Sequence, residues 1–418
     1  MLCIADNCDT RTLAVLSEAV ASTAGYDVRV IPSEAGDLGL SRNLAVQHAA
    51  GEYIGFVDAD DLVSRNWFGE AYQCNRRAQR SIFHPECNLY FGYARAFFVH
   101  RNQSAYDLRA LFFHNLWSAL SFAHSDIYRN IEYQKNLIDQ GFGYEDWHWN
   151  CETILGGHEH RMVPGTCHFV RLKEGSLSQN SAKNQCLIRP TGLWKQLALE
   201  QAARAQAGKW RRILGSWARL NQWHRQVEDT GLLSRKMFRE PADFAFEKAP
   251  VWLHNLLKLA KMDEPAIDLS GRLANFSPRI QDPFVPYLSD AILDSASRGL
   301  DIVHFFDSGQ TLKRVMPHVP ERAFAIVEEQ AAASSRNVFS IEGLEKRLGL
   351  KFEMYLAMLA VQSGCREIHI WNSCVGLRVV AKYKLALRSA VSRLYYHGDT
   401  AACPEELRTT FDACFAMS

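Results

Sequence analysis

Apolar and polar positions along the first sixty residues follow a rhythm of short strands and helices. Met1–Asp6 forms an apolar run that ends in an acid, residues 11–23 carry apolar side chains at helical spacing, and Asp27–Ile31 alternate like a strand. A turn and helix over Asp37–Ala50 lead into a second apolar run, Tyr53–Val57. This β-α-β-α-β order predicts a mostly parallel, doubly wound α/β sheet with flanking helices.

The apolar run Tyr53–Val57 stops at three acids in four positions, Asp58, Asp60 and Asp61. In an extended chain Asp58 and Asp60 share one face, so both carboxylates could address one cation. Carboxylate oxygens are the ligands that Mg²⁺ and Ca²⁺ prefer. The alternative interpretation is an ordinary strand followed by an acidic turn, and a bare D-x-D would favour it.

Two blocks of sequence make the alternative less attractive. Gly39-Leu40-Ser41-Arg42-Asn43 opens the helix, and Gly51-Glu-Tyr-Ile precedes Asp58-Ala-Asp60-Asp61. Together they resemble the nucleotide-sugar-binding half of family 2 glycosyltransferases, which have a GT-A fold, over about residues 1–180. The resemblance implies an inverting transferase that uses a nucleoside diphosphate sugar, most simply a UDP-sugar, with Mn²⁺ or Mg²⁺. The acceptor would be a glycan or a lipid-linked sugar in bacterial-type surface polysaccharide synthesis.

The resemblance assigns donor-side roles residue by residue. Asp60 would ligate the metal directly, Asp58 would contact the ribose or a metal-bound water, and Arg42 would contact the diphosphate. Asp6 would accept a hydrogen bond from the nucleobase, although Asn7-Cys8-Asp9 departs from the usual Asp-Gly-Ser. The family often places a histidine where this chain has Lys173. A protonated lysine cannot ligate a metal, so Lys173 and Arg171 are expected to neutralise phosphate charge, with His168 as a substitute ligand.

Acceptor-side roles follow from Gly141-Phe-Gly-Tyr-Glu145-Asp146-Trp147-His-Trp149. Asp146 matches the family's catalytic base and Glu145 its acidic neighbour. The structural alternative is that both acids favour a helix N-terminus because of its dipole. Trp147 and Trp149 could offer an aromatic face to the acceptor sugar, and core packing is an equal alternative.

One departure concerns the start of the chain. Family 2 enzymes begin one strand earlier than the strand that Met1–Asp6 matches. The missing strand would lie centrally, and its absence would leave unpaired backbone groups and a gap in the core. We therefore expect an N-terminally truncated GT-A domain; the alternative is that another segment fills the gap.

The rest of the chain changes character twice. We expect a GT-A domain over residues 1–185, a helical linker over 186–280 and a Rossmann-like half-domain over 281–418. The last region weakly resembles the N-terminal half of a GT-B, family 4-like glycosyltransferase. A basic, tryptophan-bearing helix between Arg189 and Arg225 could lie on an anionic membrane surface, and packing on a neighbouring domain is the alternative.

Composition narrows the function classes. A net charge of +1 gives no reason to expect a nucleic-acid partner, and eleven cysteines without a C-x-x-C pair indicate reduced thiols. The sequence contains neither an 18-residue apolar span nor a signal peptide, so a cytoplasmic protein, peripheral at the inner membrane face, is expected. A catalytically inert scaffold module is the alternative function, favoured by the missing strand and the unfinished half-domain.

Overall fold

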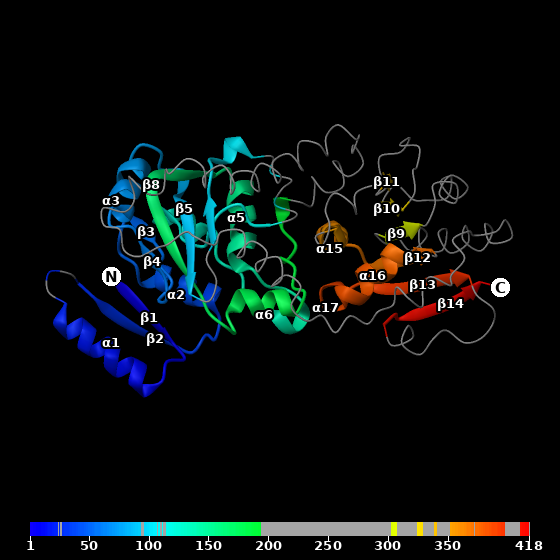
Figure 1. The fold of residues 1–418 in the computed structure, drawn as a ribbon, viewed down its shortest axis with the longest axis horizontal. Coiled ribbons are helices and arrows are strands. Elements are labelled where there is room, and N and C mark those ends of the chain that lie inside the picture. Colours follow the sequence, from blue (N-terminus) through cyan, green and yellow to red (C-terminus); the bar gives the residue numbers. More distant parts are fainter. Residues whose placement is uncertain are drawn as a thin grey trace. The chain divides into compact units, whose positions relative to one another are not determined.

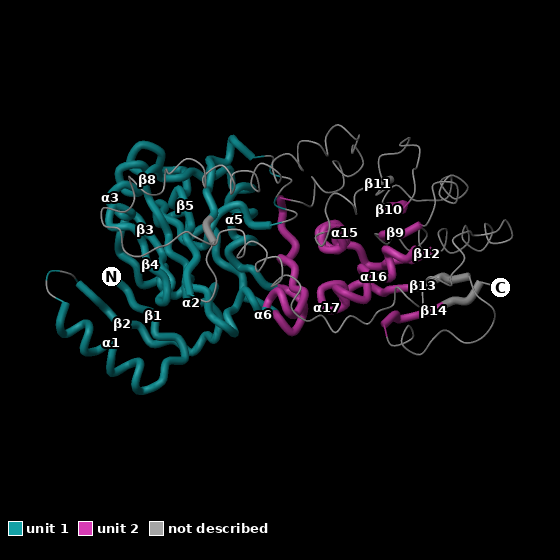
Figure 2. Tube along the Cα trace, viewed as in Figure 1, with its two compact units in different colours: residues 1–137, 143–180, 215–262 teal, residues 138–142, 181–214, 263–418 magenta. Residues whose placement is uncertain are grey.

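The structure is a computed structural model of the whole chain (Figure 1). It describes residues 1–92 except 24 and 26, residues 96–106, 108, 111 and 114–193, and in the C-terminal part 302–306, 324–328, 338–340, 352–371, 373–397 and 410–417. The chain divides into two compact units (Figure 2). Unit 1 contains the described residues 1–137 and 143–180, and unit 2 contains 138–142, 181–193 and the described residues from 302 onward.

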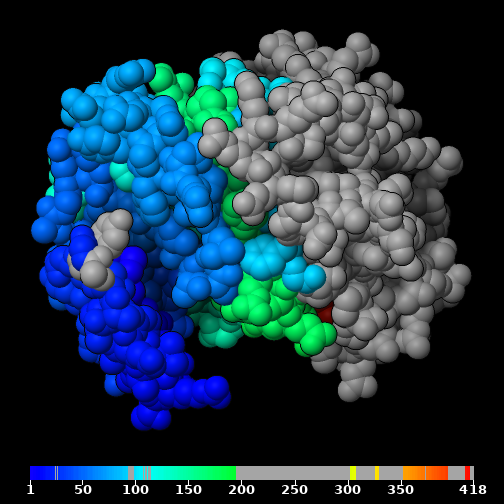
Figure 3. Space-filling view, turned by 60° about the vertical axis from the view of Figure 1, so that its left-hand side comes forward, coloured from blue at the N-terminus to red at the C-terminus, as the bar shows by residue number. Residues whose placement is uncertain are grey.

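Unit 1 begins with a β-α-β element of its own. Strands β1 (Leu2–Asp6) and β2 (Arg29–Ser33) pair in parallel as a two-stranded sheet, and α1 (Thr10–Ser22) connects them. Asp9 caps α1 by accepting a hydrogen bond from the Thr12 backbone N–H at 2.7 Å. No residue of α1 is buried, and in Figure 3 the N-terminal residues project as a lobe at the lower left. The apolar spacing of residues 11–23 therefore predicts the helix correctly without predicting a buried face.

The second sheet of unit 1 is mixed in direction. Its strand order is β3 (Tyr53–Gly55), β7 (Phe122–His124), β5 (Ser81–Gly92), β8 (Glu159–Leu172) and β4 (Leu62–Val63), with β6 (Ala96–Val99) also paired to β5. β5 and β8 run parallel, whereas β3 with β7, β7 with β5, β5 with β6 and β4 with β8 are antiparallel. Within the described residues, β3 and β1 each have one neighbouring strand, and they lie in different sheets.

Helices cover this sheet and carry the site. α2 (Leu38–His48) and α4 (Ser125–Asn130) pack near α5 (Glu145–Leu155), while α3 (Trp67–Asn75) packs on β5, β7 and β8. One core cluster places Trp149 of α5 among Val46, Ile82, Tyr128 and Tyr133. A second cluster surrounds the fully buried Trp67 of α3. Burial of these large aromatic side chains fixes α2 and α5 against the sheet.

Unit 2 contains a wholly parallel sheet. The strand order is β11 (Val338–Ser340), β10 (Phe324–Val327), β9 (Ile302–Phe306), β12 (Glu367–Trp371), β13 (Val391–His397) and β14 (Ala413–Met417). Numbered from β9 in chain order this is 3-2-1-4-5-6, the order of a doubly wound Rossmann sheet. Helices α15 (Phe352–Ser363), α16 (Cys374–Lys382) and α17 (Lys384–Leu387) connect its later strands, while the short α6 (Leu177–Lys183) spans the sequence boundary between the units.

The α/β prediction is confirmed, with one correction. The parallel arrangement predicted from the strand-helix rhythm holds for β1–β2 and for unit 2, but the sheet of residues 53–172 is mixed. An apolar pattern identifies a strand and its faces; it does not give the direction of the neighbouring strand. The predicted domain boundaries stay predictions, and the helical segment 186–280, with its basic tryptophan helix, lies outside the described residues from 194 onward.

Two further observations concern the described residues alone. Ten cysteines in this part of the chain are free thiols. Among the described helices, none is long and apolar enough to traverse a lipid bilayer.

Candidate active site

The three acids after β3 lie in a turn. The strand that follows this turn, β4, pairs with β8, so the turn lies close to the C-terminal end of β8. The Asp61 N–H donates to the Asp58 carbonyl at 3.0 Å, which closes a tight turn over residues 58–61. β4 follows at once and pairs antiparallel with β8, with Leu62 opposite Phe169 and Val63 opposite His168. This register places the acidic turn beside the last residues of β8.

Each acid in the turn has a different partner. Asp58 Oδ1 accepts from Arg42 Nη2 at 3.0 Å, and Asp60 Oδ2 forms an ion pair with Lys173 Nζ at 2.7 Å. Asp61 accepts from His168 Nε2 at 2.9 Å and from the backbone N–H of Arg171 at 2.7 Å. The extended chain assumed from the sequence would have put Asp58 and Asp60 on one face; the turn removes that alternation.

As they stand, these side chains do not form a preassembled metal site. No group of three His, Cys, Asp or Glu side chains among the described residues converges as a metal site. His168, the predicted substitute ligand, binds Asp61, and Asp60, the predicted direct ligand, already has a cationic partner in Lys173. A metal at Asp60 would share this carboxylate with the Lys173 ammonium, and the two cations would repel each other.

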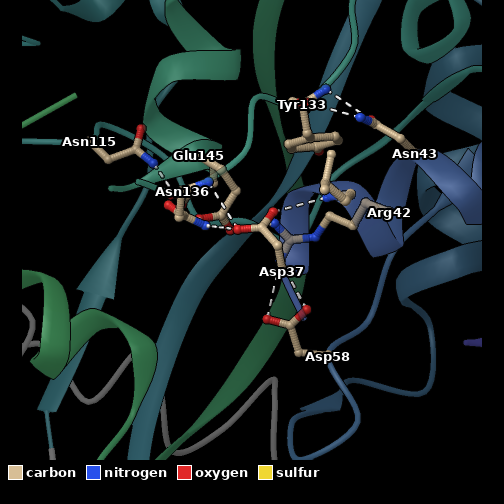
Figure 4. A network of polar contacts seen from close by, with 10 residues as sticks. Asp37, Arg42, Asn43, Asp58, Asn115, Tyr133, Asn136 and Glu145 are labelled. Atoms are coloured by element: carbon tan, nitrogen blue, oxygen red, sulfur yellow. Dashed lines mark hydrogen bonds and ion pairs between the residues drawn. The ribbon is translucent and has the colours of Figure 1, made fainter. Parts of the chain in front are cut away.

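Arg42 joins the acidic turn to α5 (Figure 4). Its Nη2 binds Asp58, its Nη1 binds Glu145 Oε1 at 2.8 Å, and its guanidinium lies 5.3 Å from the Tyr133 ring centroid. Burial alone would lower the pKa of Arg42, but the charges of Asp58 and Glu145 outweigh it and raise that pKa above its usual value. The planar fork of arginine suits two carboxylates at once.

This geometry gives Arg42 two protein partners that the sequence analysis did not predict. The residue is 3% exposed and both terminal nitrogens bind carboxylates. The buried guanidinium bridges two acids, and its predicted contact with a diphosphate stays a prediction. Glu145, 6% exposed, is likewise a partner of Arg42 and of the Asn136 side-chain amide at 3.0 Å, and so holds α5 to α2.

Three residues that the sequence analysis did not single out hold α2 to the segment before α5. Asp37 caps α2 by accepting a hydrogen bond from the Leu40 N–H at 3.1 Å. It also accepts hydrogen bonds from the backbone N–H and the side-chain amide of Asn136. Asn43 makes two hydrogen bonds with the backbone of Tyr133, at 2.8 and 2.9 Å (Figure 4). Asp37 preceding an apolar helix start is a recognisable N-cap signal; Asn136 lies in an irregular segment that carries no such signal.

Asp146 is a buried carboxylate with a raised pKa. Burial, followed by the charge of Glu145, raises the pKa of Asp146 to about 7, against the opposing charge of Arg42. Its Oδ2 accepts from Asn115 Nδ2 at 2.9 Å, and Asn115 Oδ1 accepts from Asn150 Nδ2 at 2.8 Å. Asp146 and Asn150 lie one helical turn apart on α5, so Asn115 orients the carboxylate from a fixed support.

The two tryptophans of α5 differ in what they pack against. Trp149 is 1% exposed, is stacked against Tyr128 and Tyr133, and donates to the Ile131 carbonyl at 2.7 Å. These contacts favour the core-packing alternative for Trp149. Trp147 is also buried, near Tyr144, but its indole N–H has no hydrogen-bond partner among the described residues.

Asp6 ends β1 beside the start of α2. Its Oδ1 accepts from Ser33 Oγ at 2.9 Å and from the Gly36 N–H at 3.2 Å, and its Oδ2 accepts from Ser41 Oγ at 3.0 Å. Burial acts to raise the pKa of Asp6, and the hydrogen bonds, led by that from Gly36, outweigh it and keep the pKa below its usual value. The carboxylate stays ionised, with acceptor capacity remaining on Oδ2.

The predicted residues therefore fall into two connected groups. Arg42, Asp58 and Glu145 form one chain of bonds, which Asn136 extends although the sequence did not point to it, and Asp146 is next to Glu145 on α5. Asp60, Asp61, His168 and Lys173 form the other, at the end of β8. Asn115, which positions Asp146, was missed because residues 101–143 show no periodic pattern.

The family comparison concerns the N-terminal part of the chain. Residues 1–120 match the family model described as Glycosyl transferase family 2. No curated protein matches the chain. Among solved structures, S. aureus TarS in complex with UDP is similar at 14% identity and a TM-score of 0.29, covering 44% of this chain and 54% of that one.

Two further solved structures are similar at the same level. GalNAc-T7 with UDP, GalNAc and Mn²⁺ is 13% identical with a TM-score of 0.33, covering 56% of this chain and 51% of that one. S. aureus TarS in complex with UDP-GlcNAc is 16% identical with a TM-score of 0.32, covering 62% and 70%. The first two matches span about half of each relative's length.

Proposed function

We propose that unit 1 is a glycosyltransferase that transfers a sugar, with inversion, from a nucleoside diphosphate sugar to a hydroxyl acceptor. The match of residues 1–120 to Glycosyl transferase family 2 supports the reaction class. The observation that carries the proposal is the buried bridge from Asp58 through Arg42 to Glu145, which ties the donor-side turn to the helix of the candidate base.

On the donor side, Asp6 and Asp58 are the acids suited to the nucleoside. The Asp6 carboxylate, held by Ser33, Gly36 and Ser41, is placed to accept a nucleobase N–H. Asp58 is 32% exposed at its side chain and is oriented by Arg42, which contacts both of its oxygens; their remaining lone pairs can accept from a ribose hydroxyl. Arg171 and Lys173, both exposed at the end of β8, supply positive charge for the phosphates. UDP is the donor nucleotide we propose to test first.

On the acceptor side, Asp146 takes the proton of the acceptor hydroxyl. As the oxygen attacks the anomeric carbon, the bond from that carbon to the diphosphate breaks and the diphosphate leaves with the electron pair. A base with a pKa of about 7 is largely deprotonated above neutrality and still basic enough to assist the attack. Asn115 holds the carboxylate, and Trp147 is the remaining candidate for an acceptor contact. We propose a glycan or lipid-linked acceptor at the cytoplasmic membrane face, and a surface polysaccharide as product.

The first prediction tests the base. Asp146→Asn should lower the rate of UDP release from a panel of UDP-hexoses and UDP-N-acetylhexosamines, with glycan acceptors, by about 10²- to 10⁴-fold. UDP affinity measured by calorimetry should stay within about twofold, because the amide keeps the shape and the bond to Asn115. In the wild-type protein, kcat/KM should rise with pH and reach half its maximum near pH 7, the pKa of Asp146.

The matched control is Asp126→Asn, which changes an exposed aspartate in the first turn of α4. That variant should keep both activity and the pH profile. An Asp146→Asn protein that turns over like the wild type would show that the base is another group. A wild-type protein that binds no UDP at millimolar concentration would instead favour the inert scaffold suggested by the sequence.

A further inference from the structure

The ion pair between Asp60 and Lys173 is the feature of this site that the sequence did not predict. Lys173 Nζ lies 2.7 Å from Asp60 Oδ2, a short charge-assisted contact. The two side chains come from the acidic turn and from the residue just after β8, and the β4–β8 register brings them together. The sheet itself therefore places a lysine ammonium at the carboxylate that was expected to ligate a metal.

We infer that Lys173 is the resident cation of the acidic turn and bridges Asp60 to the diphosphate of the donor, so that donor binding needs no divalent metal. This inference rests on the proposed function, because it concerns the same donor site. It differs from the sequence-based expectation, in which Asp60 and Asp58 held Mn²⁺ or Mg²⁺ and Lys173 stood apart from them.

The number of hydrogen-bond donors on the ammonium group supports a bridging role. A lysine ammonium carries three N–H donors and no acceptor. One donor binds Asp60, which leaves two for phosphate oxygens. A carboxylate-bound cation with open positions facing the ligand does electrostatically what a metal bound to a carboxylate would do, with a charge of one unit in place of two.

Accessibility of the pair supports it as well. The Lys173 side chain is 56% exposed and that of Asp60 is 31% exposed, so an incoming anion can reach the ammonium. The neighbouring acids are held elsewhere: Asp58 by Arg42, and Asp61 by His168 and the Arg171 N–H. Asp60 is thus the acid of the turn whose protein partner is a solvent-accessible cation, and Arg171, exposed two residues before Lys173, adds positive charge for the phosphates.

The experiment measures UDP affinity of the full chain by calorimetry, once in EDTA and once with added Mn²⁺. The wild-type protein should bind UDP with the same Kd, within about twofold, in both conditions. Lys173→Met should weaken UDP binding about tenfold or more in EDTA, whereas Lys173→Arg, which keeps the charge, should lose at most about threefold. Added Mn²⁺ should partly restore the Lys173→Met protein, because Asp60 is then free to bind it.

Lys183→Met is the matched control, since Lys183 is an exposed lysine at the end of α6, and its UDP affinity should not change. Equal melting temperatures of the two methionine variants would show that folding is intact. Wild-type UDP binding that is at least about tenfold weaker in EDTA would overturn the inference and leave the proposed function standing. So would a Lys173→Met protein that binds UDP normally in EDTA. Absence of UDP binding in both conditions would overturn the donor site itself.

Discussion

At the scale of single residues, Arg42 links the turn after β3 to helix α5. It is a buried cation between two carboxylates, Asp58 from the turn after β3 and Glu145 from α5. Replacing a buried ion pair as a whole can be neutral, but removing one partner leaves an uncompensated buried charge. Glu145, with 5% of its side chain exposed, would be that charge.

Arg42→Ala should therefore lower the free energy of unfolding by about 3–5 kcal/mol. Arg42→Lys should also destabilise the protein, by about 1–3 kcal/mol, because one ammonium cannot form the planar fork that reaches both acids. Urea unfolding followed by tryptophan fluorescence measures both. Arg129→Ala is the control: Arg129 pairs with Asp126 at the surface, and its loss should cost at most about 1 kcal/mol. Equal effects of the two alanine variants would contradict the bridging role.

Several candidate site residues could be identified in the sequence because strand ends and helix starts are visible in it, and their roles stay predictions. Asp6, Arg42, Asp58 and Asp146 follow or open a patterned element, and the structure places each near the bond network around α2 and α5. Their partners could not be predicted. Asn115 and Asn136 act through side-chain amides in a segment without periodicity, and Lys173 reaches Asp60 through a strand pairing that no local pattern encodes.

At the scale of elements, strands β5 and β8 contribute buried histidines that are joined by hydrogen bonds in the core. His84 and His160 share a hydrogen bond of 2.9 Å across the pair, and Thr153 of α5 bonds the second ring nitrogen of His160 at 2.9 Å. The Trp117 ring stacks on both histidines. His100 is buried alongside, bonded to the Leu116 carbonyl at 3.1 Å. Three histidines are thus held neutral between the sheet and its cover.

This arrangement predicts a loss of stability in mild acid. Burial lowers the pKa of His100 and of His160 to about 3 and holds that of His84 well below its usual value. In the unfolded chain these histidines become protonated below about pH 6.5, whereas in the folded protein they stay neutral. The free energy of unfolding is therefore at its full value above that pH and decreases as the pH falls. Each of these histidines should lower the free energy of unfolding by about 1.4 kcal/mol for every pH unit below 6.5. Asp146, with its raised pKa, acts in the opposite direction and is a single group.

Urea unfolding at pH 7.5, 6.0 and 5.0 measures the effect. His160→Gln should reduce the slope of stability against pH by about 1.4 kcal/mol per pH unit, since one buried histidine no longer titrates. His48→Gln, at the exposed end of α2, should leave the slope unchanged. A stability that does not change between pH 7.5 and 5.0 would mean that these histidines are protonated in the folded protein.

Elements themselves were predicted more reliably than their packing. The helix at residues 11–23 and the strand at Met1–Asp6 appear where the pattern places them, as α1 and β1. The apolar stripe of α1 nevertheless stays exposed, with Val15 60% accessible, because periodicity reports a face and not what covers it. The strand directions in the sheet of residues 53–172 could not be predicted either, because the pairing of two strands depends on both segments and not on the pattern within one.

At the scale of the whole molecule, the described residues form two cores, one in each unit. Unit 1 buries Trp67 and Trp149 around its mixed sheet, and unit 2 buries Phe305, Phe306 and Trp371 in its parallel sheet. The second α/β pattern was visible in the sequence because parallel strands buried on both faces, such as Ile302–Phe306, are continuous apolar runs. A chain with two such cores and its candidate nucleotide site in unit 1 should not respond to UDP as a single cooperative body.

Calorimetric melting should therefore resolve two transitions, and UDP should move one of them. At a free concentration of about 100 times Kd, UDP adds about 2.7 kcal/mol to the unit that binds it. Trp149→Ala and Trp371→Ala each remove a fully buried indole and should cost about 3–5 kcal/mol in their own units. Trp149→Ala should lower the transition that UDP raises, and Trp371→Ala should lower the other. One transition that responds to both substitutions and to UDP would show that the donor site draws its stability from both cores.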